Sequence, residues 1–117
     1  MFFEKTGFTS PGTSYRVDFT QPAPTTPTLF RTISVAGISP HEFVTDQVFF
    51  NSKDGTVIPM FLTSLKDVAR DGTAPVLQYG YGGFSVSMDP FFSPSLLTWI
   101  KHYRGVLAVV NLRGGGE

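Results

Sequence analysis

The chain of 117 residues carries nine Lys plus Arg against nine Asp plus Glu, so its formal net charge is zero. A neutral chain offers no electrostatic attraction to nucleic acid or to an anionic membrane, and neither is expected as a partner. It has no cysteine, which excludes disulfides, thiolate nucleophiles and cysteine metal sites. Hydrophobic residues make up 41% of the chain and aromatic residues 15%, which is enough apolar material for a packed core.

The opening segment, residues 1–7, lacks the apolar core of a signal peptide. No run approaches the roughly 20 apolar residues that a membrane-spanning helix needs. Together with the lack of cysteine, these features predict a soluble protein of a reducing compartment, and the cytoplasm is the expected location.

The first part of the chain, residues 1–38, predicts short antiparallel strands that lack a complete core. The Pro-Gly pair at residues 11–12 is typical of a tight turn. Apolar residues alternate in residues 13–19, as in a half-buried strand. Three prolines within residues 22–27 predict an exposed, extended loop before one more strand at residues 29–35. This part is therefore expected to be the end of an all-β domain.

Residues 41–62 predict a β-hairpin, because Asp54-Gly55 lies between two apolar segments. Pro59 falls in the returning strand and has no N–H to donate to a ladder, which predicts an edge strand or a bulge. The polar residues 66–71 that follow predict a surface loop.

Residues 76–79 and 106–110 are continuous apolar runs, as expected for strands covered on both faces. Between them Ser93 can cap a helix, Pro94 suits its first turn and Gly105 can end it. Strand, helix and strand in this order predict two parallel strands joined by a right-handed crossover. The expected class is α/β, because an antiparallel hairpin followed by such a unit is how an α/β-hydrolase sheet often begins.

A segment rich in aromatic residues and glycine, LQYGYGGF at residues 77–84, leads out of the first of these strands. Its glycines predict a loop rather than a continued strand, and a tyrosine among them can present its hydroxyl to a reacting group. In open α/β sheets, site residues lie on loops beyond the carboxyl ends of the strands. The alternative is a tight aromatic turn with a purely geometric role, and the residues alone leave both interpretations open.

The complete machinery of a serine hydrolase is not predicted within the chain. A nucleophile elbow needs Gly-x-Ser-x-Gly, and Ser85 lacks both the second glycine and a strand directly before it. His41 and His102 precede any plausible elbow, whereas the histidine of such a triad follows the serine. Two isolated histidines make no zinc site, and the glycine run at residues 114–116 lacks the Gly-Lys-Ser/Thr ending of a phosphate loop.

Four segments together resemble prolyl oligopeptidase, a family of serine peptidases. They are LQYGYGGF at residues 77–84, GVLAVVNLRGGGE at 105–117, SKDGTVIPMF at 52–61 and FTSPG at 8–12. The resemblance covers nearly the whole chain in the same order. The YGYGGF block favours this branch over relatives of oligopeptidase B or acylaminoacyl-peptidase.

The resemblance implies an architecture, because the family has a β-propeller that caps an α/β-hydrolase domain. It implies that residues 1–38 are the C-terminal end of the propeller and the crossing. It implies that residues 39–117 are the incomplete N-terminal part of the hydrolase peptidase domain. It also implies a fragment, with the serine, aspartate and histidine of the triad beyond Glu117.

The resemblance further implies a serine endopeptidase that cleaves short peptides on the carboxyl side of proline through an acyl-enzyme. No cofactor or metal is expected, and the full-length protein is expected to be a monomer. Tyr81 matches the tyrosine whose hydroxyl helps form the oxyanion hole, and Phe84 matches the aromatic that lines the pocket for the substrate proline. Tyr79 and the neighbouring glycines match scaffold, while Arg113 and Glu117 are expected to order the loops or to form a structural salt bridge.

Two further functions remain open from the sequence. Some fungal members of the family also release and macrocyclise a peptide precursor, so that an amine takes the acyl group in place of water. The other possibility is a non-catalytic binding protein that keeps the propeller and the hydrolase shell. On every view, the 117-residue piece alone is expected to be inactive.

Overall fold

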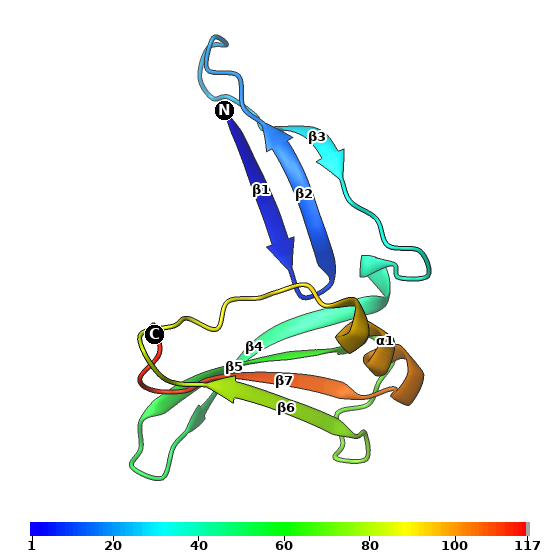
Figure 1. Cartoon of the computed structure of the whole chain (residues 1–117), viewed down its shortest axis with the longest axis vertical. Coiled ribbons are helices and arrows are strands. Elements are labelled where there is room, and N and C mark those ends of the chain that lie inside the picture. The colour runs from blue at the N-terminus through cyan, green and yellow to red at the C-terminus, as the bar shows by residue number, and fades with distance from the viewer. Residues whose placement is uncertain (117) are drawn as a thin grey trace.

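The computed structural model describes residues 1–116, which form mostly β-strands in two sheets. The elements in chain order are β1 (Phe2–Gly7), β2 (Ser10–Arg16), β3 (Thr28–Thr32), the 3₁₀ helix η1 (Pro40–Glu42), β4 (Phe43–Asn51), β5 (Val57–Leu65), β6 (Val76–Tyr81), α1 (Pro94–Tyr103) and β7 (Val106–Asn111). Figure 1 shows the sheet of β1 to β3 above the sheet of β4 to β7, with α1 beside the second sheet. No helix in this part of the chain has both the length and the apolar character needed to cross a membrane.

The first sheet has the antiparallel order β1-β2-β3 and corrects two predictions. The tight turn lies at residues 8–9, and Pro11 and Gly12 belong to β2. Pairing between Gly7 and Ser10 closes the hairpin before the Pro-Gly pair is reached. The strand also ends at Arg16, so the alternating pattern of residues 13–19 extends past the true end of the strand.

The second sheet has the order β4-β5-β7-β6, and its first two strands form the predicted hairpin around Asp54-Gly55. Gly55 has a φ of 85°, a left-handed conformation that glycine adopts without strain. The prediction of an edge strand or a bulge for β5 was wrong, since β5 lies between β4 and β7 and pairs with β4 without a shift in register. Pro59 is nevertheless tolerated, because the pairing of β5 with β7 begins only at Met60.

The strands β6 and β7 are parallel and are joined through α1, which confirms the predicted strand–helix–strand unit. The Ser93 hydroxyl accepts the N–H of Leu96 at 3.5 Å and caps the helix, and Pro94 stands in its first turn. The helix ends one residue earlier than predicted. Arg104, with a φ of 51°, takes the left-handed capping position instead of Gly105.

The two parallel strands differ in burial, which corrects the expectation that both are covered. The apolar residues of β7 are all buried, because β5 and β6 flank this strand. Every residue of β6 is exposed, with Val76 61% and Tyr79 49% accessible. Within the described residues, β6 is the outermost strand of its sheet, and α1 packs mainly on β5 and β7.

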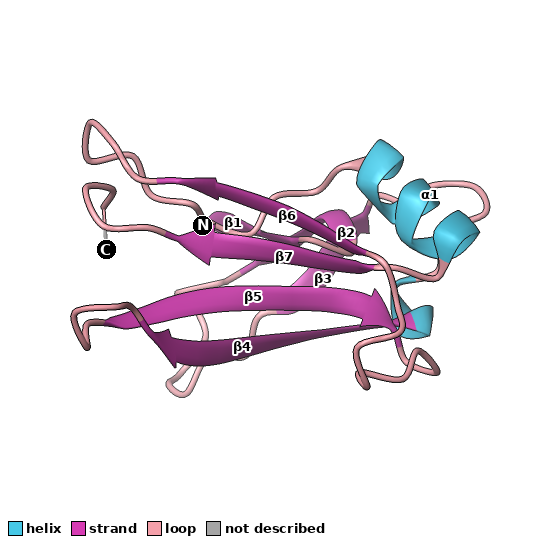
Figure 2. Cartoon of the chain, turned by 90° about the horizontal axis from the view of Figure 1, so that it is seen from below, coloured by secondary structure: helices cyan, strands magenta, loops and turns pink. Residues whose placement is uncertain are grey.

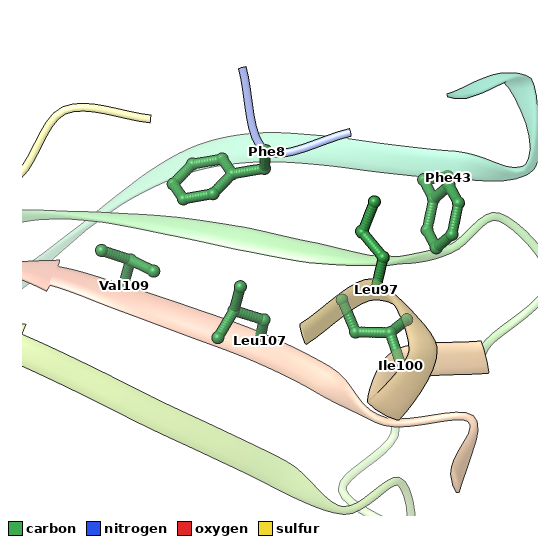
Figure 3. Close-up of a cluster of buried hydrophobic side chains, with 6 residues drawn as sticks. All are labelled: Phe8, Phe43, Leu97, Ile100, Leu107 and Val109. Carbon is green, nitrogen blue, oxygen red and sulfur yellow. The ribbon is translucent and has the colours of Figure 1, made fainter. Parts of the chain in front are cut away.

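A hydrophobic core joins α1, the second sheet and the turn of the first sheet. Its buried members come from distant parts of the chain and are Phe8, Phe43, Leu97, Ile100, Leu107 and Val109. Figure 3 shows the Phe8 ring entering this cluster from the β1–β2 turn, on the side of the sheet where Val109 and Leu107 of β7 project. Phe8 is 4% exposed, and its ring centroid lies 5.6 Å from that of Phe61 and 5.8 Å from that of Phe91. The two sheets are therefore packed together through an aromatic side chain.

Candidate functional site

Two loops meet at the carboxyl end of the parallel strand pair. The 82–93 loop follows β6, and the 112–116 loop follows β7. The parallel register, which runs from Val76 opposite Val106 to Tyr81 opposite Asn111, ends both strands at the same level. Figure 2 shows both loops leaving the sheet at the end opposite α1, beside the turn that joins β4 to β5. This is the edge at which open α/β sheets place their functional residues.

Tyr81 is the last residue of β6 and not a loop residue, which corrects the prediction that the glycine-rich segment leaves the strand earlier. Gly80 stays in the ladder opposite Val110, and Tyr81 pairs with Asn111. A strand residue holds its side chain in a better-defined direction than a free loop residue does. Tyr81 is 39% exposed, so its side chain is accessible to a bound molecule.

The Tyr81 hydroxyl lies over Gly83. A Cβ atom built on Gly83 would stand 3.4 Å from the hydroxyl oxygen, with two more ring atoms of Tyr81 within 4 Å. Any longer side chain at position 83 would therefore crowd the hydroxyl. The glycine keeps the space beside this donor open.

Phe84 is presented to solvent on a left-handed backbone. It is 93% exposed, and its φ of 54° is followed by a φ of 55° at Ser85. For a residue other than glycine this conformation costs roughly 1–2 kcal/mol, so two in succession need support from their surroundings. Strain of this kind clusters at binding and catalytic loops. An apolar ring held outward at such a cost is suited to packing against a ligand.

The support comes from the 112–116 loop, on which the start of the 82–93 loop is seated. The Ser85 N–H donates to the Gly114 carbonyl at 3.2 Å, and the Ser87 hydroxyl donates to the Gly116 carbonyl at 3.2 Å. A Cβ atom on Gly114 would lie 2.9 Å from the Gly82 carbonyl oxygen, and one on Gly116 would collide with the Ser87 hydroxyl. Glycine is therefore required at both positions for the loops to approach this closely.

Arg113 connects the same loop to the turn between β4 and β5. Its Nη1 donates to Asp54 Oδ2 at 2.6 Å and to the Thr56 hydroxyl at 3.3 Å. The hydrogen bond from Arg113, together with the N–H of Thr56, lowers the pKa of the Asp54 carboxyl to about 2. The other residue predicted to order these loops, Glu117, lies outside the described residues.

The two histidines lie away from this site. His41 belongs to η1, and His102 lies on α1 with its ring 4.7 Å from that of Tyr103. An ion pair of 2.7 Å between Lys101 and Glu42 holds η1 against α1, at the end of the sheet opposite the two loops. Within residues 1–116, no three His, Asp or Glu side chains are grouped closely enough to hold a metal ion.

Sequence reasoning missed the contribution of Ser85, Ser87 and Asn111 to this site. Ser85 was considered only as the serine of a nucleophile elbow, and Ser87 was assigned no role. The signal that could have found both is the pair of glycine-rich segments after adjacent parallel strands. Asn111 Oδ1 is buried and finds no hydrogen-bond partner among the residues that the structure describes. Because it lies opposite Tyr81, this unsatisfied acceptor belongs to the same edge.

The chain is similar over almost its whole length to prolyl oligopeptidases of fungi. It is 52% identical over 116 residues to prolyl oligopeptidase A of Galerina marginata (strain CBS 339.88), covering 99% of this chain and 16% of that protein. It is 48% identical over 116 residues to the dual function macrocyclase-peptidase POPB of the same organism, again covering 99% and 16%. The chain thus spans about one sixth of the length of the curated relatives it matches.

The fold gives the same result as the sequence. Prolyl oligopeptidase B from Galerina marginata, solved with a 25mer macrocyclization substrate, matches with a TM-score of 0.92 and 48% identity. The match covers 98% of this chain and 16% of that one. No family model matches the chain. The two sheets of this chain therefore match one part, about one sixth, of that longer structure.

Proposed function

Because this chain belongs to the prolyl oligopeptidases by sequence and by fold, we propose that it forms part of the active site of a serine-type prolyl endopeptidase. The proposal is supported by the position of Tyr81 and Phe84 at the carboxyl end of β6. The 82–93 loop, which carries Phe84, is hydrogen-bonded to the 112–116 loop that follows the neighbouring strand β7. In this proposal the chain supplies an oxyanion donor and a pocket wall. Other parts of the longer protein supply the serine, aspartate and histidine of the triad.

The two sheets correspond in this proposal to two domains. Residues 1–38 form the end of a β-propeller and the crossing, and residues 39–117 begin an α/β-hydrolase domain. The antiparallel β4–β5 pair followed by the parallel β6–α1–β7 unit supports this division, since such a hydrolase sheet often begins in this order. The exposed outer edge of β6 is where further strands of the hydrolase sheet would add.

Tyr81 acts in the acyl-transfer step. When the serine oxygen bonds to the carbonyl carbon of the substrate, the histidine of the triad takes the serine proton. The π electrons of the carbonyl move to its oxygen, which becomes an oxyanion. The Tyr81 hydroxyl donates a hydrogen bond to that oxyanion, and a backbone N–H beside the serine provides the second donor. Preorganised donors 2.7–3.1 Å from the oxyanion contribute about 3 kcal/mol each to lowering the barrier.

Phe84 forms one wall of the pocket for the substrate proline. A flat ring can pack against the pyrrolidine without any charge, so it favours proline over polar residues. Its exposure of 93% within this chain leaves the ring free for that contact. The substrates in this proposal are short peptides that contain proline, and the reaction needs no cofactor.

Peptide macrocyclisation is the second candidate function. It is favoured by the 48% identity to a protein named a dual function macrocyclase-peptidase, and by the fold match to a relative bound to a macrocyclization substrate. The acyl-enzyme would be the same, with an amine of the precursor attacking in place of water. Hydrolysis and macrocyclisation are distinguished by incubating the whole protein with a long precursor and measuring the product masses by mass spectrometry. A cyclic product is lighter than the linear one by one water.

The proposed function is tested with the whole protein and a peptide that carries a chromophore after proline. We expect cleavage on the carboxyl side of proline and far slower cleavage of the matched peptide that has alanine there. Peptide binding without any cleavage would contradict the proposal and support a non-catalytic binding protein instead.

A further inference from the structure

The 112–116 loop needs an external anchor to hold its shape. Glycines at positions 114 and 116 have no side chain that could pack against the sheet, and Gly114 adopts a φ of 89°. Glycine-rich backbone has many accessible conformations, so the observed one must be selected by its contacts. The bonds from Ser85 and Ser87 join this loop to the 82–93 loop, which is itself strained.

Arg113 reaches in the other direction, to a rigid part of the sheet. Its partner Asp54 stands in the connection between β4 and β5, residues 52–56, and the Thr56 N–H donates to Asp54 Oδ1 at 3.1 Å. The carboxylate is therefore fixed by the turn before it meets the guanidinium. A contiguous series of contacts runs from this turn through Arg113 and the backbone of the 112–116 loop to Ser85, next to Phe84.

We propose that Arg113 is a positioning residue for Tyr81 and Phe84, acting through its ion pair with Asp54 to fix the loop on which the 82–93 loop is seated. The inference rests on the proposed function, because it assigns Tyr81 and Phe84 their roles in binding and turnover. Arg113 itself does not touch the substrate. The pair is half exposed, at 54% and 52% of the two side chains, so it adds little to overall stability and acts on the local arrangement.

The test replaces Asp54 in the whole protein by asparagine, which keeps a side-chain oxygen to accept the Thr56 N–H but removes the charge. The matched control is Asp67→Asn. Asp67 and Arg104 form an ion pair of 3.0 Å with comparable exposure, 70% and 56%, and Arg104 immediately follows α1, away from the two loops. Both substitutions remove one exposed carboxylate from one arginine.

We expect Asp54→Asn to lower kcat for the prolyl peptide about two- to fivefold, the range that an exposed ion pair can supply. Asp67→Asn should leave kcat unchanged, and neither variant should change the melting temperature by more than a few degrees. Raising the ionic strength from 0.1 to 1 M shortens the screening length from about 10 to about 3 Å. The ratio of wild-type to Asp54→Asn turnover should therefore fall towards one.

Substituting Arg113, alone and together with Asp54, shows whether Arg113 acts through Asp54. The double variant Asp54→Asn with Arg113→Gln should lose no more turnover than either single variant. Additive losses would overturn the proposal, because they would mean that the two residues act separately. Equal losses in Asp54→Asn and Asp67→Asn would overturn it as well, since the effect would then not depend on this loop.

Hydrogen exchange gives a readout that does not depend on turnover. The amides of residues 82–87 should exchange about two- to fivefold faster in Asp54→Asn than in the wild type and should be unchanged in Asp67→Asn. If the wild-type protein cleaves no prolyl peptide, the proposed function fails on its own. Unchanged exchange in Asp54→Asn overturns the link between Arg113 and the loop, whatever the activity.

Discussion

A Cβ atom on Gly82 would lie 2.7 Å from the Cβ of Leu112, closer than side-chain atoms come to one another in folded proteins. At this contact the backbone that leaves β6 lies close against the backbone that leaves β7. The first residue after Tyr81 is thereby held against a neighbouring backbone and not left in open solvent. The direction of Tyr81 depends on that approach.

Gly82→Ala is expected to push the two loops apart. The added methyl group meets backbone atoms of the 112–116 loop, which cannot rotate away as a side chain can. Displacing the Tyr81 hydroxyl by about 1 Å can lower turnover about 100-fold. Gly7→Ala is the control, since nothing lies within 4 Å of its Cβ position. Steady-state kinetics of both variants in the whole protein provide the measurement, and wild-type turnover in Gly82→Ala would contradict the prediction.

Tyr81→Phe removes one hydrogen-bond donor and keeps the ring. We expect kcat to fall about 10²–10³-fold with KM nearly unchanged, because the donor acts on charge that develops only in the transition state. Tyr79→Phe is a matched control two residues earlier on the same strand, and it should keep wild-type turnover. If the two variants behave alike, the oxyanion role belongs to another residue.

Phe84→Ala is expected to lower kcat/KM for prolyl peptides about tenfold or more, the value of burying an aromatic ring against a ligand. The unfolding free energy should change by less than about 0.5 kcal/mol, since the ring is 93% exposed among the described residues. Phe19→Ala, at a residue 67% exposed, should change neither quantity. The role of Phe84 as a pocket wall is refuted if the prolyl and alanyl peptides lose rate equally.

The ion pair of Asp54 predicts a pH dependence with a definite sign. The folded-state pKa of about 2 lies below the ordinary value of 3.8, because Arg113 and the turn favour the charged carboxylate. The stabilisation is therefore complete above about pH 4 and is lost as the pH falls towards 2. The difference in unfolding free energy between wild type and Asp54→Asn, measured at several pH values, should shrink over that interval. A difference that grows on acidification would have the wrong sign.

The sequence predicted the turn and the helix start, whose conformations depend on the residues at those positions themselves. Asp54-Gly55 forms the hairpin turn because glycine accepts its left-handed φ of 85°, and Ser93 with Pro94 begins the helix as expected. Tyr81 and Phe84 could be singled out from the sequence because the segment around them resembles a known family. The structure adds where these side chains stand relative to the neighbouring loop.

Other parts depend on contacts between distant segments, which local signals do not encode. Gly80 would weaken an isolated strand, yet the ladder with Val110 keeps β6 extended through Tyr81. Pro11 lies inside β2 because the hairpin turns earlier, at residues 8–9. The seating of Ser85 on Gly114 joins positions almost thirty residues apart and required the three-dimensional structure.

The insertion of Phe8 between the sheets limits how freely they can separate. Any tilting that widens the gap at the β1–β2 turn must withdraw a ring that is 4% exposed and bring it into water. Exposing a phenylalanine costs about 2 kcal/mol, so an open arrangement at this point would be populated at only about 3% in the absence of a compensating contact. Separation of the sheets at this turn would therefore need another apolar group to take over the contacts that Phe8 makes.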